Sequence, residues 1–309
     1  MITGGAGFVG SHLADRLVDD GYEIMAIDDL SKGKVSRLSE ARRRGSVSFH
    51  QVDIRTDELF NVTVKFAPDV IFHLAAQASV SNSVANPKLD ADINVLGTLN
   101  VLEAARRCET KRLVFTSTGG AVYGSTVQLP AKESYAKRPD SPYGISKKVV
   151  EDYFRFYRNE YDIDYAIIGP ANIYGPRQDP FGEAGVVAIF SRSCLDRTPP
   201  TIFGTGEDTR DYVYVEDIVD AIVRAGATGG GRFFNIGTGV ETTTNEVFQA
   251  IASHTKFGGG ANYGPPRAGD IPRSVLDSTL ARDKLGWEPY TSFDEGIRRT
   301  VEWFATNPE

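Results

Sequence analysis

The sequence contains few cysteines and histidines for its length. Only Cys108 and Cys194 occur among 309 residues, which excludes a disulfide framework and predicts free thiols in a reducing cytoplasm. The four histidines have no metal-ligand spacing, so we assign no metal. No apolar run approaches the roughly 20 residues of a membrane-spanning helix, and no signal peptide precedes the first motif. A cytoplasmic location without a membrane is therefore expected.

Positive charge is also scarce. The 34 lysines and arginines face 41 aspartates and glutamates, which gives a net charge of −7. The cationic triplet 42–44 is typical of a solvated helix end, so a nucleic-acid partner is not expected. The length and the hydrophobic share of 41% suit one large domain or two closely packed ones.

The first half of the chain alternates short apolar runs with amphipathic stretches. Buried strands are expected at 22–27, 47–50, 70–74 and 113–116, and helices at about 11–20, 56–66, 88–107 and 143–161. Before the first helix, only Met1–Thr3 is available for a strand. This alternation predicts an α/β fold with a Rossmann-like, doubly wound parallel sheet.

The second half has a different texture. Glycine, proline and aromatic residues cluster at 169–185, 198–206 and 258–269, and helical patterns lie at about 184–196, 216–226, 244–255 and 294–305. We therefore expect residues 1–170 to form one domain around the parallel sheet and residues 171–309 a smaller C-terminal lobe. The segment 211–238 is expected to return to the main sheet, so that the two parts are interleaved.

A glycine-rich loop opens the chain. Gly5–Gly10 fits GxGxxG, and Gly4, Gly7 and Gly10 also fit GxxGxxG. Such glycines permit a tight turn and a close approach to phosphates, while a helix beginning near Phe8 directs N–H groups at a pyrophosphate. The next strand-like run ends at Asp28 and Asp29, acids that accept from ribose hydroxyls and repel a 2′-phosphate. The pattern favours NAD over NADP; an ordinary turn with surface acids is the alternative.

Tyr143 and Lys147 form a Tyr-x-x-x-Lys pattern that places a phenol and an ammonium one helical turn apart. A tyrosine that acts as a base near neutral pH needs its pKa lowered by roughly three units. The Lys147 charge and an oxidised nicotinamide are candidates for that effect. Upstream, Ser117 and Thr118 offer hydroxyls at a strand end. A solvated helix pair and turn-forming hydroxyl residues are the competing interpretations.

Together, these motifs resemble those of the extended short-chain dehydrogenase/reductases, in particular bacterial UDP-glucose 4-epimerases. The resemblance rests on the order and spacing of motifs along nearly the whole chain, at Thr3–Leu13, Asp28–Ser31, Asp53–Ile54, His73–Gln77, Asn94, Ser117–Gly124, Tyr143–Lys147, Asn172–Asp179, Gly182–Phe190, Arg210–Val215 and Arg267–Asp270. It implies a tightly held NAD that is not consumed, and a UDP-hexose that is oxidised transiently at C4 and reduced on its other face.

The resemblance also implies site residues. The positions that match cofactor contacts are Gly4, Gly7, Phe8, Val9, Gly10, Asp28, Asp29, Ser31, Asp53, Ile54, Leu74, Ala75, Ala76, Gln77, Asn94, Tyr143, Lys147 and Pro170. Those that match the substrate side are Thr118, Tyr143, Asn172, Val186, Thr201, Phe203, Arg210, Arg267, Asp270 and Ser274. Tyr143, Lys147 and Thr118 are the implied catalytic residues. Because an extra glycine shifts the register, Ser117 and Gly119 remain alternatives to Thr118.

Several positions depart from the family pattern. Gly169-Pro170 replaces Arg-Tyr, and Ala78 replaces a lysine found in some members. Related dehydratases and decarboxylases carry an acid just before Val-Tyr-Gly, where this chain has Gly119–Ala121. A UDP-glucuronate 4-epimerase needs no such acid and remains an alternative. A dinucleotide-sensing binding protein is the non-enzyme alternative, although such proteins generally lack the tyrosine and lysine.

Two finer expectations follow from the resemblance. Ser274 stands where a tyrosine excludes N-acetylated sugars in relatives, so a 2-acetamido group is expected to be tolerated unless Arg273 fills the space. A homodimer is expected through a four-helix interface. The helical faces proposed for it carry Val95, Leu99 and Leu102 on one helix and Val149, Tyr153 and Phe156 on the other.

Overall fold

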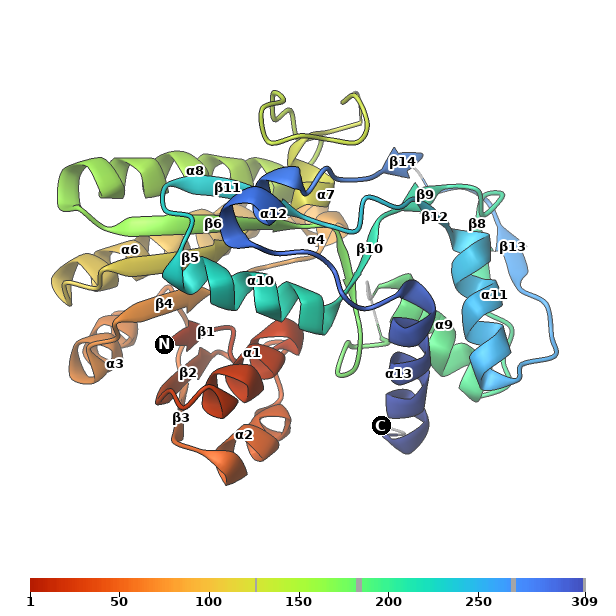
Figure 1. Ribbon diagram of the computed structural model, residues 1–309, viewed down its shortest axis with the longest axis horizontal. Helices are drawn as coiled ribbons and strands as arrows, with labels where there is room; N and C mark the ends of the chain where they lie inside the picture. The colour runs from red at the N-terminus through yellow and green to blue at the C-terminus, as the bar shows by residue number, and fades with distance from the viewer. Residues whose placement is uncertain (126, 182–184, 268–270, 308–309) are drawn as a thin grey trace.

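A computed structural model describes residues 1–125, 127–181, 185–267 and 271–307. Its centre is a seven-stranded parallel sheet with the strand order β11-β6-β5-β4-β1-β2-β3 (Figure 1). The strands are β1 (Ile2–Thr3), β2 (Ile24–Asp28), β3 (Val47–Gln51), β4 (Val70–His73), β5 (Arg112–Thr116), β6 (Asp164–Pro170) and β11 (Arg232–Ile236). The predicted Rossmann-like, doubly wound sheet is confirmed.

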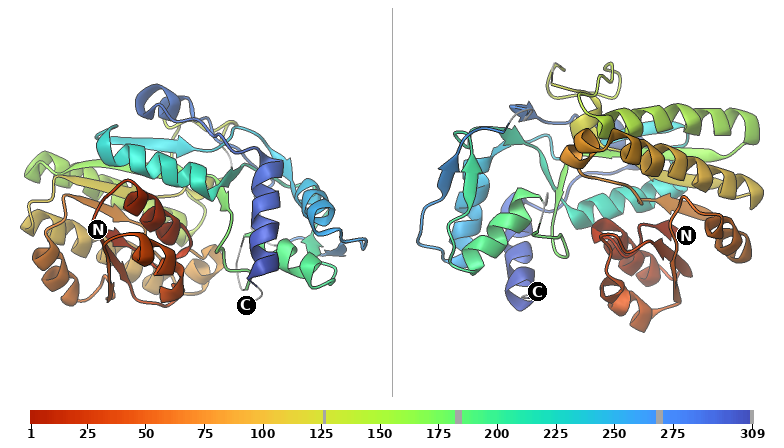
Figure 2. Two further views of the ribbon diagram at one scale, coloured as in Figure 1. Left: turned by 60° about the horizontal axis from the view of Figure 1, so that its bottom comes forward. Right: turned by 180° about the vertical axis from the view of Figure 1, so that it is seen from behind.

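Helices cover both faces of this sheet (Figure 2). One face packs against α1 (Phe8–Asp19) and α10 (Val215–Ala227), and the other against α3 (Glu58–Phe66), α6 (Gly97–Arg107) and α8 (Pro142–Tyr161). Along β5, Val114 packs into the core on the α1 and α10 side of the sheet, and its neighbours Leu113 and Phe115 pack into the core on the other side. Because both faces are buried, these strands are continuous apolar runs without polar alternation.

The long helical pattern predicted at 88–107 is interrupted. It consists of α5 (Pro87–Ala91), a π-helical segment η2 (Asp92–Leu96) and α6. Short elements that periodicity does not reveal are η1 (Val35–Leu38), α2 (Ser39–Arg44), α4 (Val80–Ala85), α7 (Gly119–Val122) and α12 (Thr279–Leu285). Segments of one or two turns are too short for a clear apolar period. No helix of the described ranges is long and apolar enough to cross a membrane.

The smaller part of the molecule lies beyond one end of the sheet and has its own core (Figure 1). Its strands are β7 (Asn172–Tyr174), β8 (Thr201–Phe203), β9 (Thr209–Arg210), β10 (Tyr212–Tyr214), β12 (Thr242–Thr243), β13 (Asn262–Gly264) and β14 (Arg273–Ser274). They form three small sheets, accompanied by α9 (Val186–Leu195), α11 (Thr244–Thr255) and α13 (Phe293–Thr306).

The chain crosses between the two parts more than once. After β10 it returns through α10, and β11 then pairs with β6 at the edge of the main sheet. It returns again near the C-terminus, where Ala281, Leu285 and Trp287 join the core under the main sheet. The Trp287 Nε1 donates to the Asp217 carbonyl oxygen across 2.8 Å. The C-terminal region thus contributes to both parts.

Candidate functional site

The glycine loop runs tightly between β1 and α1. Gly4 has a φ of +68°, and a Cβ added there would lie 2.8 Å from the Ala75 backbone nitrogen. A Cβ at Gly10 would lie 2.1 Å from the Gly4 carbonyl oxygen. Helix α1 begins at Phe8, and its N-cap Gly7 offers no side-chain cap. The first-turn amides therefore face a compact loop that can accept a phosphate group closely.

Asp28 connects the end of β2 to this loop. The carboxylate accepts from the Ala6 amide at 3.0 Å and the Leu30 amide at 2.9 Å. Burial raises its pKa above the usual range, and the two N–H donors oppose that effect. The neighbouring Asp29 is exposed and accepts from the Ser31 amide across 2.9 Å. Each Asp28 oxygen retains a free lone pair for a further donor.

Asp53 and Ile54 lie just past the end of β3. The Asp53 carboxylate accepts from the Arg55 Nη2 across 2.6 Å, and this hydrogen bond lowers the pKa of Asp53. Ile54 is buried. The helix that follows takes Asp57 as its N-cap, so Asp53 is not a helix cap.

The loop after β4 carries the predicted residues Leu74, Ala75, Ala76 and Gln77, all half-buried. Gln77 and Asn94 exchange two hydrogen bonds of 2.9 Å each, one in each direction between side-chain amide and backbone. This exchange fixes the loop against η2. It also brings Asn94 close to the glycine loop, because Gly4 contacts Ala75.

Helix α8 carries Tyr143 and Lys147 in its first turns. Ser141 caps the helix by accepting from the Gly144 amide, and Pro142 occupies its first position. Lys147 is buried, and its Nζ donates to the Thr116 carbonyl oxygen at the end of β5 across 2.9 Å. The same Nζ lies 5.9 Å from the centre of the Tyr143 ring. The helix thus anchors the ammonium against the carboxyl end of the sheet.

The protonation of this pair depends mainly on burial. Burial lowers the pKa of Lys147 to about 7, and the negative charge of Asp90 opposes that shift. Burial raises the pKa of Tyr143 to about 12; Asp90 adds to this increase, and a hydrogen bond with Thr118 opposes it. The expected depression of the phenol pKa is therefore not provided by the protein groups alone.

Thr118 is the hydroxyl residue that acts on Tyr143, because a hydrogen bond from it opposes the rise that burial causes in the pKa of the phenol. Ser117 Oγ is buried and has no hydrogen-bond partner in the described part of the chain. Gly119 begins α7 and carries no hydroxyl. Of the three alternatives that the sequence left open, the geometry favours Thr118.

The unusual Gly169-Pro170 pair has a steric basis. A Cβ at Gly169 would lie 2.3 Å from the Phe233 Cζ of the neighbouring strand β11. A Cβ at Gly119 would lie 2.7 Å from the Gly169 carbonyl oxygen. Strand β6 and helix α7 therefore approach each other closely next to Thr118, and a large residue at position 169 would displace the Phe233 ring.

The predicted substrate residues lie on several elements of the smaller part. Arg210 and Ser274 are partners in the β9–β14 register, and the Arg267 guanidinium lies 3.8 Å from the Phe203 ring centre. Asn172, Val186 and Thr201 stand at the starts of β7, α9 and β8. Asp270 lies outside the described residues.

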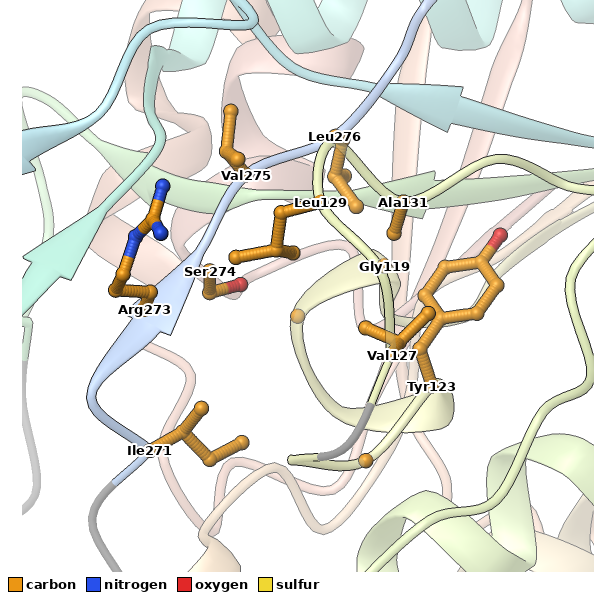
Figure 3. Close-up of a pocket in the computed structure, with 12 residues that line it drawn as sticks. Gly119, Tyr123, Val127, Leu129, Ala131, Ile271, Arg273, Ser274, Val275 and Leu276 are labelled. Atoms are coloured by element: carbon orange, nitrogen blue, oxygen red, sulfur yellow. The ribbon is translucent and has the colours of Figure 1, made fainter.

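A pocket separates α7 from β14 (Figure 3). Gly119 and Gly120 line one side of it and Ser274 the other, and Ile271, Val127 and Leu129 complete an apolar wall. Arg273 turns away from the pocket toward Glu241, with its Nε 2.8 Å from Oε2. A small hydroxyl side chain and two glycines therefore face this pocket.

Sequence reasoning missed one buried acid near these residues. Asp90 on α5 has only 1% of its surface exposed, and its charge acts on both Tyr143 and Lys147. The signal available in the sequence is its position four residues before Asn94, a spacing that brings two side chains together on a helix. Such a pair is common and does not by itself indicate a site.

Comparison with known proteins places the chain in a family. Residues 1–300 match the family described as GDP-mannose 4,6 dehydratase. The chain is 50% identical over 310 residues to the UDP-glucose 4-epimerase of Mycolicibacterium smegmatis, a match that covers 100% of this chain and 99% of that protein. The chain belongs to the extended short-chain dehydrogenase/reductases. The resemblance seen in the motifs is thereby confirmed over the full length.

Solved structures of this family agree with the fold. The UDP-glucose 4-epimerase of Thermotoga maritima, solved with UDP-glucose, superposes with a TM-score of 0.95 at 45% identity, covering 100% of this chain and 99% of that one. The UDP-glucose 4-epimerase of Thermus thermophilus, solved with NAD, gives a TM-score of 0.92 at 41% identity and covers 98% and 97% of the two chains.

Proposed function

We propose that this chain is an NAD-dependent isomerase that inverts C4 of a UDP-hexose and interconverts UDP-glucose and UDP-galactose. The observation that carries the proposal is the arrangement of Tyr143, Lys147 and Thr118 at the carboxyl end of β5. The glycine loop follows β1 at the same edge of the sheet, two strands away. In a parallel α/β sheet, ligands bind at this edge. Full-length identity to UDP-glucose 4-epimerases supports the same reaction.

The residues around the glycine loop fit a dinucleotide. The space left by Gly4 and Gly10 admits no side chain, and the start of α1 favours a pyrophosphate. The remaining lone pairs of Asp28 suit ribose hydroxyls and oppose a 2′-phosphate, which favours NAD. When bound, NAD supplies hydride exchange and, in its oxidised form, a positive charge that lowers the pKa of Tyr143.

Side chains of the protein transfer the proton of the sugar 4-hydroxyl. Tyr143 takes the proton of the sugar 4-hydroxyl while hydride leaves C4, and it returns the proton when hydride is added to the other face. Thr118 hydrogen-bonds the same oxygen, and Lys147 supplies a positive charge one helical turn from the phenol. Most of the binding energy lies on the UDP group, so the hexose can turn over between the two hydride transfers.

The smaller part of the molecule binds the UDP group. Arg210 and Arg267 suit the diphosphate because a guanidinium binds phosphate oxygens bidentately. Phe203 and Thr201 offer a surface for the uracil, with Asn172 and Val186 beside the sugar diphosphate. We accordingly assign residues 1–170 and the return segment 211–238 to NAD binding. The rest of residues 171–309 is assigned to the nucleotide sugar. Within that part, the stretch 279–287 packs against the core of the main sheet.

We assign the hexose to the pocket between α7 and β14, whose lining favours a neutral sugar over a glucuronate. Arg273 is the cation among the described pocket-lining residues, and it is already paired with Glu241. A glucuronate carboxylate would enter this pocket without a free positive partner there. Serine at position 274 replaces the tyrosine of relatives and removes an aromatic ring, so we propose that N-acetylated UDP-hexoses are tolerated.

We further propose a homodimer. Val149, Tyr153 and Phe156 on α8 are exposed, as are Leu89 and Leu96 on the adjoining α5 and η2. A contiguous apolar face of this kind suits a partner subunit. Of the residues named from the sequence, Leu102 on α6 is fully buried in the core, while Val95 on η2 and Leu99 on α6 pack partly against it. The prediction for Leu102 is therefore wrong, because that side chain faces the main sheet.

The cytoplasmic location stays a prediction that agrees with the free Cys108 and Cys194.

The test is interconversion of UDP-glucose and UDP-galactose by the purified protein without added NAD, followed by NMR of the product. Formation of the C4 epimer from either sugar is the expected result. Turnover of UDP-glucuronate in preference to both hexoses would select the alternative substrate. Binding of NAD with no turnover of any UDP-sugar would indicate a dinucleotide-sensing protein.

A further inference from the structure

Asp90 lies at the centre of a buried polar cluster next to the candidate catalytic residues. Its carboxylate accepts from three side chains: Gln77 Nε2 at 2.9 Å, Asn94 Nδ2 at 3.0 Å and Ser146 Oγ at 2.6 Å. We call these four residues the Asp90 cluster. They come from the loop after β4, from α5 and η2, and from α8. The cluster thus joins three separate chain segments at one carboxylate.

The Ser146 bond is placed where it affects catalysis. Ser146 is the residue immediately before Lys147 and lies less than one turn after Tyr143. Helix α8 is therefore held to α5 at the turn that carries both candidate catalytic residues. The Asn94 bond holds η2, where the wider π-helical turn positions Asn94, and the Gln77 bond holds the loop after β4. Such π-turns occur frequently at functional sites.

The charge of Asp90 requires compensation. All three donors in the cluster are uncharged, and a carboxylate buried with neutral donors is costly unless a cation lies nearby. Lys147 is also buried, with 3% of its surface exposed, and its hydrogen bond goes to the neutral Thr116 carbonyl. The two opposite charges compensate each other across the site, since Asp90 raises the pKa of Lys147 against the effect of burial.

Few other titratable groups face Lys147. His73 approaches from β4, and burial together with the Lys147 charge lowers its pKa to about 3, so it stays neutral. Its ring is held between Thr3 Oγ1 at 2.7 Å and Thr98 Oγ1 at 2.9 Å. From β5 the neighbouring group is the Phe115 ring, 4.6 Å from Nζ, and on α8 it is Tyr143. Within the part of the chain that the structure describes, Asp90 is therefore the anionic group that acts on this ammonium.

We propose that Asp90 is a positioning residue for the reaction: its buried carboxylate keeps the Lys147 ammonium charged and, through Ser146, fixes the turn of α8 that presents Tyr143. This inference rests on the proposed function, because it concerns the same catalytic pair. Among the described hydrogen bonds, none joins Asp90 to Tyr143 or Lys147. Asp90 acts on Lys147 through its charge and on the first turns of α8 through Ser146. The same negative charge keeps Tyr143 protonated until a positive charge arrives beside it.

The first test follows Lys147 itself. Protein labelled with ¹³C at the lysine ε-carbons is titrated by NMR, and the Lys147 signal is assigned by its loss in Lys147→Arg. In Asp90→Asn the titration midpoint is expected to fall by about one pH unit, the lower end of the effect of a nearby opposite charge. Asparagine has the shape of aspartate, and Ser146 can reverse its hydrogen bond. If this variant fails to fold, Asp90→Ser removes the same charge.

Two comparison variants separate charge from packing. Ser146→Ala removes one hydrogen bond and keeps the carboxylate, so the Lys147 midpoint should stay at its wild-type value. Glu160→Gln removes an exposed carboxylate near the far end of α8 and should also leave the midpoint unchanged. An unshifted midpoint in Asp90→Asn, or an equal shift in Ser146→Ala, would overturn the proposal.

The second test is the pH dependence of kcat/KM for UDP-galactose. Asp90 stabilises the protonated forms of both Tyr143 and Lys147, so in Asp90→Asn both limbs of the profile should move to lower pH by about one unit. A packing defect would lower the whole profile without moving it, and that result would contradict the proposal. If no variant turns over a UDP-sugar, the proposed function fails, whereas the NMR titration still decides the role of Asp90.

Discussion

The Arg273 guanidinium is bound by Glu241, to which its Nε donates across 2.8 Å. This hydrogen bond lowers the pKa of Glu241 to about 2, so the pair stays ionised at neutral pH. Because Arg273 is the immediate neighbour of Ser274, its direction decides how much space remains beside the serine. The arginine that the sequence offered as a side chain to fill the space beside Ser274 is bound to Glu241 instead.

Substrate range should follow from the small side chain of Ser274. We expect UDP-galactose and UDP-N-acetylgalactosamine both to be turned over, and Ser274→Tyr to lower kcat/KM for the N-acetylated sugar selectively, by at least about tenfold. Measurement of kcat/KM for both sugars checks this. A preference above about a thousandfold for the unsubstituted sugar, unchanged in Ser274→Gly, would show that Ser274 does not set the range.

The purified protein should carry NAD. Denaturation followed by mass analysis is expected to release NAD(H), because the glycine loop and Asp28 favour a dinucleotide without a 2′-phosphate. Asp28→Asn should weaken the preference for NAD over NADP by at least about tenfold, since the repulsion of a 2′-phosphate is lost. Release of NADP alone would contradict the assignment.

Loss of the phenol should abolish most of the chemistry. Tyr143→Phe is expected to lower kcat by at least about a hundredfold while KM changes little, because the substrate is held through UDP. Retention of more than a tenth of wild-type kcat would exclude Tyr143 as the base.

The two neighbouring hydroxyls should differ in effect. Thr118→Ala should lower kcat less than Tyr143→Phe does, since it removes the hydrogen bond between Thr118 and Tyr143 and leaves the phenol in place. Ser117→Ala is the matched control, because the Ser117 hydroxyl has no partner among the described residues. A silent Thr118→Ala beside a damaging Ser117→Ala would reverse the register.

The buried Lys147 should make stability depend on pH. Its folded-state pKa is about 7, whereas a lysine in an unfolded chain titrates near 10.4. Between these values the unfolded state binds more protons, so stability should rise with pH, by at most about 1.4 kcal/mol per unit. Below pH 7 the full cost of the buried ammonium applies.

A pair of methionine variants isolates this effect in protein freed of dinucleotide. The Tm of Lys147→Met relative to that of wild type should fall between pH 6 and pH 9, because only the wild type gains stability as Lys147 loses its proton. Lys148→Met, at an exposed position on the same helix, should give a difference that does not vary with pH. A constant difference for Lys147→Met would mean that Lys147 does not titrate in this range.

The exposed face of α8 should be the dimer interface. Light scattering at micromolar concentration is expected to give the mass of two chains, and Phe156→Glu should give one, because a charge would be buried in the apolar interface. Lys65→Glu on α3, which lies on another exposed surface, should leave the mass unchanged. A monomeric wild-type protein would refute the dimer.

Much of the fold could be predicted from local patterns. The apolar runs became strands β2 to β5 with ends shifted by at most two residues, and the long amphipathic stretches became α1, α3, α8 and four helices of the second half. These elements are long enough to show a period and are limited by glycine, proline or capping residues. The π-helical break in 88–107 was missed, because it depends on how Asn94 meets Gln77 and Asp90.

The sequence alone determined the chemistry available to this protein. The glycine loop, the acid after the next strand and the Tyr-x-x-x-Lys pair are local in the chain, so their spacing sets what each can bind or exchange. The tertiary structure decided which hydroxyl reaches Tyr143, where Arg273 points and which acid acts on Lys147. Those relationships join residues from different segments. Only the packing of α5, α7, α8 and β14 around the sheet brings them within the few ångströms over which hydrogen bonds and buried charges act.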